Sequence, residues 1–343
     1  MVGGCHFRSP VGVWLRKVRV MPKDVGFWIV LGALLLAVGV FVFGLLRQRS
    51  HGGYKGTPEV AIPPEQPNEA AGPPPLPSEW TPYATGSSWA GEVSPPPLSG
   101  SMTSGWWRVS SNVYHWYDLL LAGFIATIYL LPMFVGGQPE VKVTFSVALS
   151  TILTQLFLMA MVIGFVAWRQ NPSRWLGLRW PMWPLVFPIA IVGVLFTWGV
   201  LGVLQMLGFI DWLQSLLGND GKQDVVKAFT EADSPLLLAT LVVMAVVVAP
   251  LTEEVMFRGY LYPVAKRYIG RVEAIIFSSL IFAVIHHNAM ALLPLFVLAV
   301  LLALAYEFTG SIWAPIGIHT LFNGATVGAQ LAIKYGLIQE PGP

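Results

Sequence analysis

Cysteine and charge are the two things that this sequence has least of. One cysteine, Cys5, stands among 343 residues, so the chain has no internal disulfide framework and no cysteine-rich metal or cluster site. Charged residues make up 11%, less than half of the roughly 25% that is typical of a soluble domain. The net charge is only +2, which gives no electrostatic footprint for nucleic acid, so we expect no nucleic-acid partner.

The sequence is rich in apolar residues. They make up 55% of the sequence, and the 14 tryptophans suit a protein with many membrane–water boundaries. A helix needs about 20 apolar residues to cross a bilayer. The sequence therefore predicts an all-α fold, a polytopic transmembrane helical bundle of about eight spans in contact with the lipid bilayer. The predicted spans are 27–46, 117–134, 143–168, 185–207, 235–257, 273–286 (short for a full span), 290–308 and 312–333.

Proline marks off one segment from the rest. Residues 52–105 hold 12 of the 27 prolines, and such a stretch buries too little apolar surface to offset its chain entropy. It predicts a disordered tether; a docking site for a proline-binding domain is the less favoured alternative. The expected organisation is an N-terminal segment (1–26), an N-terminal transmembrane anchor (27–46), a Pro-rich disordered linker (47–114), a multi-span membrane core (115–336) and a C-terminal tail (337–343).

The loops differ in charge. Loop 169–184 carries three arginines and no acid, and residues 266–271 carry three more basic side chains. Loop 208–234 holds five acids against two lysines. Since cytoplasmic loops carry the excess of Lys and Arg, the first two segments should face the cytoplasm and the third should face outward.

Three charges stand near the end of the fifth apolar run, in the stretch APLTEEVMFRGYL. The Leu, Val and Phe residues of 235–257 favour insertion by roughly 4–7 kcal/mol, and two ionised acids at mid-depth cost about 5–7 kcal/mol. Glu253 and Glu254 must therefore face protein or a wet cavity, which makes them functional candidates. Glu254 and Arg258 are four residues apart and can pair, whereas Glu253 points about 100° away.

Two later spans contribute further polar groups. His286 ends the sixth span, and His319 and Asn323 share one face of the eighth. A lone intramembrane histidine is often a satisfied interhelical donor. Together with Glu253, however, these types supply a general base, a second proton-transfer group and donors for an oxyanion, and they could equally bind zinc. Neither GxSxG nor HExxH occurs.

At these residues the sequence resembles the CPBP family of intramembrane proteases, which includes CAAX prenyl endopeptidases and abortive-infection proteins. The family pattern EExxxR, FxxxH and HxxxN matches 253–258, 282–286 and 319–323, and the resemblance covers about residues 143–333. It implies that Glu253 activates a water with His286, and that His319 and Asn323 support the oxyanion or complete the site. Glu254 and Arg258 would then brace the site, with Phe282 packed against it.

The resemblance implies an intramembrane endopeptidase that acts on a membrane-associated protein or peptide, in a bacterial cytoplasmic membrane. The motifs leave the cofactor open between none and a divalent metal such as zinc, and we favour the metal-free form. A metal would be held by Glu253, His286 and His319. Two alternatives are a non-catalytic membrane scaffold or immunity-type protein on the same fold, and a proton-coupled transporter that uses the intramembrane charges.

Overall fold

The computed structural model describes residues 25–50, 108–134, 143–217 and 224–339. Within these ranges the chain is helical and contains no strand, as predicted. The N-terminal segment before residue 25, the linker from 51 to 107 and the last four residues lie outside the described part. Residues 108–114, which the sequence assigned to the linker, contact the core: the Arg108 N–H donates to the Glu307 carbonyl (2.9 Å) and the Tyr114 hydroxyl to the Gly259 carbonyl (3.1 Å).

Six helices of the described residues are long and apolar enough to cross a membrane, so the protein is an integral, multi-pass membrane protein. Helices α12 (Arg271–Val284) and α14 (Trp313–Lys334) form where the remaining two of the eight predicted spans were expected. The six are α2 (Val25–Ser50), α3 (Trp116–Phe134), α4 (Phe145–Ala167), η1 with α6 (Trp183–Met206), the helix Pro235–Ile269, and α13 (Ala289–Thr309).

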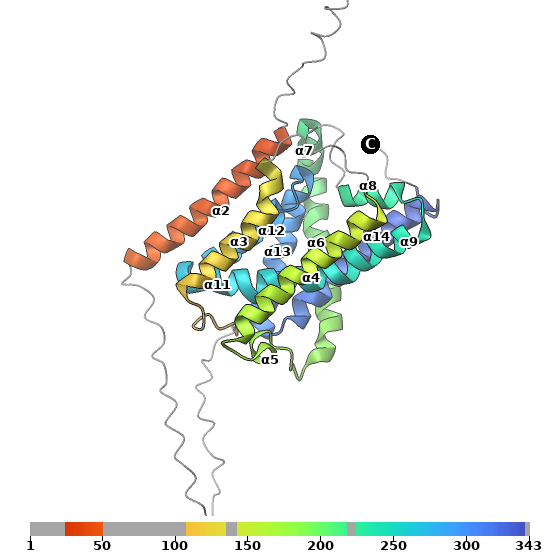
Figure 1. The fold of residues 1–343 in the computed structure, drawn as a ribbon. Helices are drawn as coiled ribbons and strands as arrows, with labels where there is room; N and C mark the ends of the chain where they lie inside the picture. The colour runs from red at the N-terminus through yellow and green to blue at the C-terminus, as the bar shows by residue number, and fades with distance from the viewer. Residues whose placement is uncertain (1–24, 51–107, 135–142, 218–223, 340–343) are drawn as a thin grey trace, which may run out of the picture.

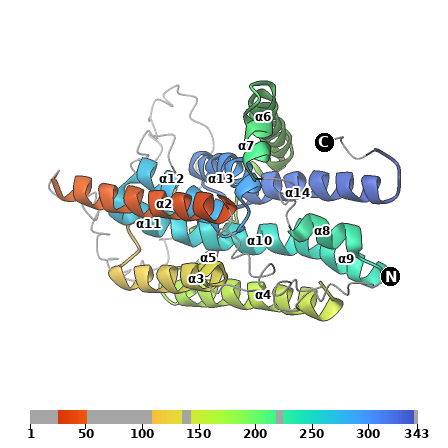
Figure 2. The same ribbon diagram turned by 90° about the horizontal axis from the view of Figure 1, so that it is seen from above.

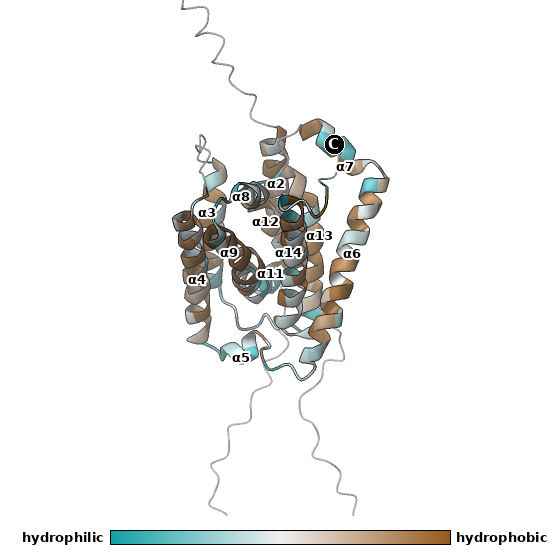
Figure 3. Ribbon diagram, turned by 90° about the vertical axis from the view of Figure 1, so that its right-hand side faces the viewer, coloured by the Kyte–Doolittle hydropathy of each residue, from teal (hydrophilic) through white to brown (hydrophobic). Residues whose placement is uncertain are grey.

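The helices lie in layers around the helix Pro235–Ile269 (Figures 1 and 2). Seen from above, α3 and α4 lie on one side of this helix, and α2, α12, α13 and α14 lie on the other, with α6 outermost. The short helix α5 (Pro172–Trp175) lies at the opposite end of the bundle from α7 (Phe209–Leu217) and α8 (Asp224–Glu231) (Figure 1). This arrangement places the arginine-bearing loop and the acidic loop at opposite ends. Figure 3 shows hydrophobic residues along the outer helices α4 and α6 and more hydrophilic ones at α5 and α7.

The central helix is longer than predicted and is not a regular α-helix. The sequence ended it at residue 257, but it continues through the charged residues to Ile269, 35 residues in all. It consists of α9 (Pro235–Val243), a π-helical turn η3 (Met244–Val248), α10 (Ala249–Glu254), a second π-helical segment η4 (Val255–Leu261) and α11 (Tyr262–Ile269).

Each π-helical segment precedes a proline, and side chains from elsewhere bind the carbonyl groups that the proline leaves unpaired. Proline has no N–H to donate to a preceding turn. In η3 the N–H of Ala249 donates five residues back, so Pro250 would be the next donor, to the Ala245 carbonyl. The Asn323 amide donates to that carbonyl instead (2.9 Å).

A related arrangement lies ahead of Pro263. In η4 the N–H of Tyr262 donates five residues back to the Phe257 carbonyl, and Pro263 has no N–H for the two carbonyls that follow, those of Arg258 and Gly259. The Gly259 carbonyl lies four residues before this proline and accepts hydrogen bonds from the Trp175 indole (2.8 Å) and the Tyr114 hydroxyl (3.1 Å). Such π-bulges with proline are recognised causes of helix bending, and they occur often at functional sites.

Buried charges also connect the layers. Asp118 of α3 is fully buried and accepts two hydrogen bonds from the Arg169 guanidinium (2.6 and 2.8 Å) and one from the Tyr260 hydroxyl (3.0 Å). The hydrogen bonds with Asp118 raise the pKa of Arg169, which lies just beyond the end of α4. Nearby, the fully buried Glu307 pairs with Lys266 of α11.

Candidate functional site

The two glutamates lie on α10, a six-residue α-helical segment between the two π-helical segments. Glu254 has no exposed surface and Glu253 is 9% exposed. Both therefore face protein, as the cost of placing acids in lipid required.

Glu254 is bound on its Oε1 atom by two basic side chains. The Arg258 guanidinium donates to it at 2.9 Å, and the Nδ1 of His319 lies 2.8 Å away. The predicted ion pair between Glu254 and Arg258 is thus present. Arg258 also donates to the Ala299 carbonyl (3.2 Å), and its guanidinium carbon lies 4.4 Å from the centre of the Phe282 ring. Glu254 therefore joins the central helix to α14, and Arg258 joins it to α12 and α13.

Glu253 has a different environment. Its Oε2 atom is buried and has no hydrogen-bond partner among the described protein groups, and it lies 4.0 Å from the Nε2 of His319. The carboxylate of Glu253 is also close enough to His286 to interact with it electrostatically. A buried carboxylate oxygen that accepts no hydrogen bond from the protein is available to accept one from a water or a substrate.

In both histidines Nδ1 lies within hydrogen-bond distance of a protein oxygen, which leaves Nε2 for another partner. The Nδ1 of His286 lies 2.8 Å from the Phe282 carbonyl, which only accepts, so this nitrogen carries the hydrogen. In the neutral ring, Nε2 is then an acceptor. His319 is arranged likewise, with Nδ1 against Glu254 and Nε2 toward Glu253. Hydrogen bonds of this kind fix the tautomer and the orientation of the ring.

Phe282 forms the apolar wall between these groups. Its ring is fully buried, 5.1 Å from the His286 ring and 5.8 Å from the His319 ring, and it meets Phe257 edge-on at 5.2 Å. The expected packing role of Phe282 agrees with these contacts. The ring thus contacts both imidazoles and the Arg258 guanidinium.

Asn323 is placed at the backbone of the central helix rather than at a side chain of the site. Its amide nitrogen donates to the Ala245 carbonyl, eight residues before Glu253. This contact attaches α14 to the π-helical turn that leads into the two glutamates. Support of an oxyanion by Asn323 stays a prediction.

The donor set of Glu253, His286 and His319 has the right chemistry for zinc, with one ring nitrogen of each histidine held by the protein. In the described part of the chain, however, no three His, Cys, Asp or Glu side chains lie close enough together to hold one ion. The cofactor therefore stays a prediction.

Two supporting contacts were missed by the sequence analysis. Thr252, beside the glutamates, lies within hydrogen-bond distance of Gln155 on α4 (3.3 Å). His287 has a left-handed backbone (φ 51°), and its ring binds the Tyr129 carbonyl of α3 (2.9 Å). The sequence offered two signals for these contacts: the amide Gln155 inside an apolar span, and His287 beside the FxxxH motif.

Comparison with known proteins gives a match for the segment that carries all of these motifs. Residues 235–325 match the family model described as "Type II CAAX prenyl endopeptidase Rce1-like". This segment is therefore similar to the Rce1-like domain. The resemblance to CAAX-type membrane proteases that the motifs predicted is thereby confirmed for the region from α9 into α14.

A curated relative aligns over a similar length. The membrane-embedded CAAX protease MroQ of Staphylococcus aureus (strain USA300) is 37% identical over 91 residues, which is 25% of this chain and 37% of that protein. The alignment thus spans little more than a third of the relative. No solved structure matches the chain. The family model that residues 235–325 match describes a membrane endopeptidase, and the N-terminal helices α2 and α3 lie outside the matched segment.

Proposed function

We propose that the protein is an intramembrane endopeptidase that hydrolyses a peptide bond of a membrane-associated protein or peptide, with Glu253 as the general base. One observation carries the proposal: of the two adjacent buried glutamates, Glu254 accepts hydrogen bonds from Arg258 and His319 through Oε1, whereas within the described residues the Glu253 carboxylate accepts none and lies 4.0 Å from the Nε2 of His319. The match of residues 235–325 to the family model of a CAAX prenyl endopeptidase supports it.

The arrangement supports a direct attack by water. A water between Glu253 and the Nε2 atoms of His319 and His286 would donate its hydrogens to acceptors on both sides. Glu253 takes one proton as the oxygen attacks the peptide carbonyl, and that proton is then delivered to the leaving amine. Glu254 and Arg258 hold His319 and the helix in place and do not exchange protons in this scheme.

Loop charge and similarity to a known protease support proposals for the location and for the substrate. We propose a bacterial cytoplasmic membrane, since the relative MroQ is a bacterial membrane protein, with the basic loop 169–184 at the cytoplasmic end. The substrate would be a segment anchored in that membrane. The similarity to a CAAX protease supports peptide-bond hydrolysis, and no residue described here selects a prenyl group.

The experiment compares one carboxyl-to-amide substitution in the site with another outside it, and adds His286→Ala. The full chain is purified as wild type, Glu253→Gln, His286→Ala and Glu273→Gln, and each is incubated with a membrane-tethered peptide library. Glu273 is a suitable control because it is also buried (6% exposed) and pairs with Arg47 (2.7 Å) outside the site. Cleavage should fall by about 10²–10⁴-fold for Glu253→Gln and should persist for Glu273→Gln.

Each alternative predicts a different outcome. Equal cleavage by all four proteins would refute the assignment and indicate a contaminating protease. A cellular phenotype that survives Glu253→Gln and His286→Ala would favour the scaffold, and proton-linked uptake in proteoliposomes that Glu253→Gln abolishes, with no cleavage, would favour the transporter.

A further inference from the structure

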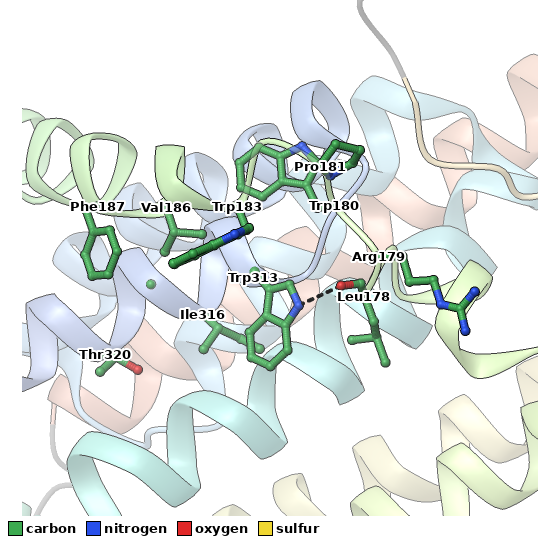
Figure 4. A pocket seen from close by; sticks show the side chains of 11 residues that line it. Leu178, Arg179, Trp180, Pro181, Trp183, Val186, Phe187, Trp313, Ile316 and Thr320 are labelled. Carbon is green, nitrogen blue, oxygen red and sulfur yellow. Dashed lines mark hydrogen bonds between the residues drawn. The ribbon is translucent and has the colours of Figure 1, made fainter.

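A pocket of about 690 Å³ lies between the start of α6 and the first half of α14. Its volume is in the range of pockets that hold small molecules, about 300–1,000 Å³. Trp313, Ile316, Gly317 and Thr320 of α14 form one wall, and Thr320 directly follows His319. Trp183 of η1, with Val186 and Phe187 of α6, lies across from them (Figure 4).

The wall made by residues 178–181 is held in place, together with residues 176–177 before it, by the turn between α13 and α14. The Leu176 carbonyl accepts from the Ile312 N–H (2.9 Å), and the Leu178 carbonyl accepts from the Trp313 indole (3.1 Å; dashed in Figure 4). Gly177 between them has φ +61°, and a Cβ there would come within 1.9 Å of the Gly310 carbonyl oxygen. Only glycine fits this approach, so the loop that closes the pocket is a built part of the fold.

The lining combines a broad apolar interior with a single charge. Three tryptophans contribute to it: Trp180 is buried, while Trp183 and Trp313 are 59% and 40% exposed. The charge is Arg179, which is exposed at the rim, and its guanidinium points away from the tryptophans in Figure 4. No acidic residue lines the pocket, and Arg179 forms no ion pair within the part of the chain that the structure describes. A ligand that satisfies both parts has a hydrocarbon portion and an anionic group.

The position of the pocket in the bundle identifies a source for such a ligand. The pocket lies where the apolar span of α6 begins and where the loop with three arginines and no acid ends. Exposed tryptophans at this level are typical of the membrane–water boundary. Basic side chains at the cytoplasmic boundary attract the anionic lipids of that leaflet.

We propose that this pocket binds one anionic phospholipid. Its phosphate lies at Arg179, and one acyl chain lies between Trp183 and Trp313 and extends along α14 toward Thr320. The site is separate from the proposed hydrolysis and does not depend on it. The lipid chain would contact Thr320. This residue follows His319 on α14, and His319 binds Glu254.

The charge requirement is tested by lipid titration of the full chain in detergent, with bound lipid counted by native mass spectrometry. Wild type should retain one phosphatidylglycerol more tightly than phosphatidylcholine. Arg179→Gln should weaken phosphatidylglycerol binding by about fivefold, the contribution of one basic residue near a membrane surface. Arg174→Gln is the matched control, because Arg174 lies on the same loop but does not line the pocket.

The apolar requirement is tested by a second pair. Trp183→Ala should weaken the binding of phosphatidylglycerol and phosphatidylcholine alike, whereas Trp168→Ala should not, since Trp168 is 87% exposed and lies outside the lining. Phe187→Ala replaces Trp183→Ala if that variant does not fold. The proposal is overturned by equal binding of both lipids to wild type, by equal losses in Arg174→Gln and Arg179→Gln, or by unchanged binding in Trp183→Ala or its replacement.

Discussion

Replacing Arg258 with methionine should destabilise the protein by about 3–5 kcal/mol, the usual cost of removing one partner of a buried ion pair. Arg258 is 2% exposed and Glu254 is fully buried, so water cannot reach either group to compensate. The methionine keeps most of the volume and the contact with Phe282 but leaves the Glu254 carboxylate with His319 alone. The free energy of unfolding would be measured in mixed micelles with increasing sodium dodecyl sulfate, from the loss of helical signal.

Two further variants separate the charge from the packing. Arg258→Met combined with Glu254→Gln should recover at least half of the loss, because no uncompensated charge then remains. Arg179→Met removes an arginine that is exposed and should change stability by no more than about 0.5 kcal/mol. A loss below about 1 kcal/mol in Arg258→Met, or additive losses in the double variant, would refute the buried-pair reasoning.

Three other outcomes follow from the same structure. Asn323→Ala should cost about 1–3 kcal/mol of unfolding free energy, because the Ala245 carbonyl loses its donor; unchanged stability would contradict the contact. Arg169→Met should cost about 3 kcal/mol by leaving Asp118 buried without a cation; a change below about 0.5 kcal/mol in the same assay would show that the pair is dispensable. Cleavage by the purified protein should persist after treatment with a zinc chelator, and a loss that added zinc restores would establish a metal enzyme.

The transmembrane helices were predictable because a bilayer imposes a length on apolar runs. The boundaries of α3, α4 and α13 lie within two residues of the expected ones, and α14 formed where the eighth span was placed. The pair of Glu254 with Arg258 followed from its spacing alone, since residues four apart share a helix face.

The course of the central helix beyond residue 257 was not predictable in this way. Hydropathy falls at Arg258 and again at Lys266, so a prediction from the length of the apolar run ends the helix before Arg258. In the folded protein these charges are compensated by Glu254 and Glu307, and the helix continues to Ile269. The pair of Arg258 with Glu254 was predicted, but the compensation of Lys266 by Glu307 is visible only after α13 is placed beside the helix.

Contacts between distant segments leave no local pattern. Asp118 and Arg169 are 51 residues apart, and the basic loop was interpreted only as a sign of orientation. Asn323 was expected among the chemical groups because of its distance of four residues from His319. Its partner, the Ala245 carbonyl, is freed by a π-helical turn that the sequence marks only through Pro250.

The π-helical turn η3 has a consequence for comparing this chain with others. An α-helix advances about 100° per residue, so one extra residue in a wide turn changes the angular position of everything beyond it. Loss of one residue within Met244–Val248 would rotate Glu253 by that angle relative to Pro235–Val243. A related chain with an uninterrupted helix here should therefore align with a one-residue gap inside Met244–Val248, and a gapless alignment would match the wrong residues on one side of it.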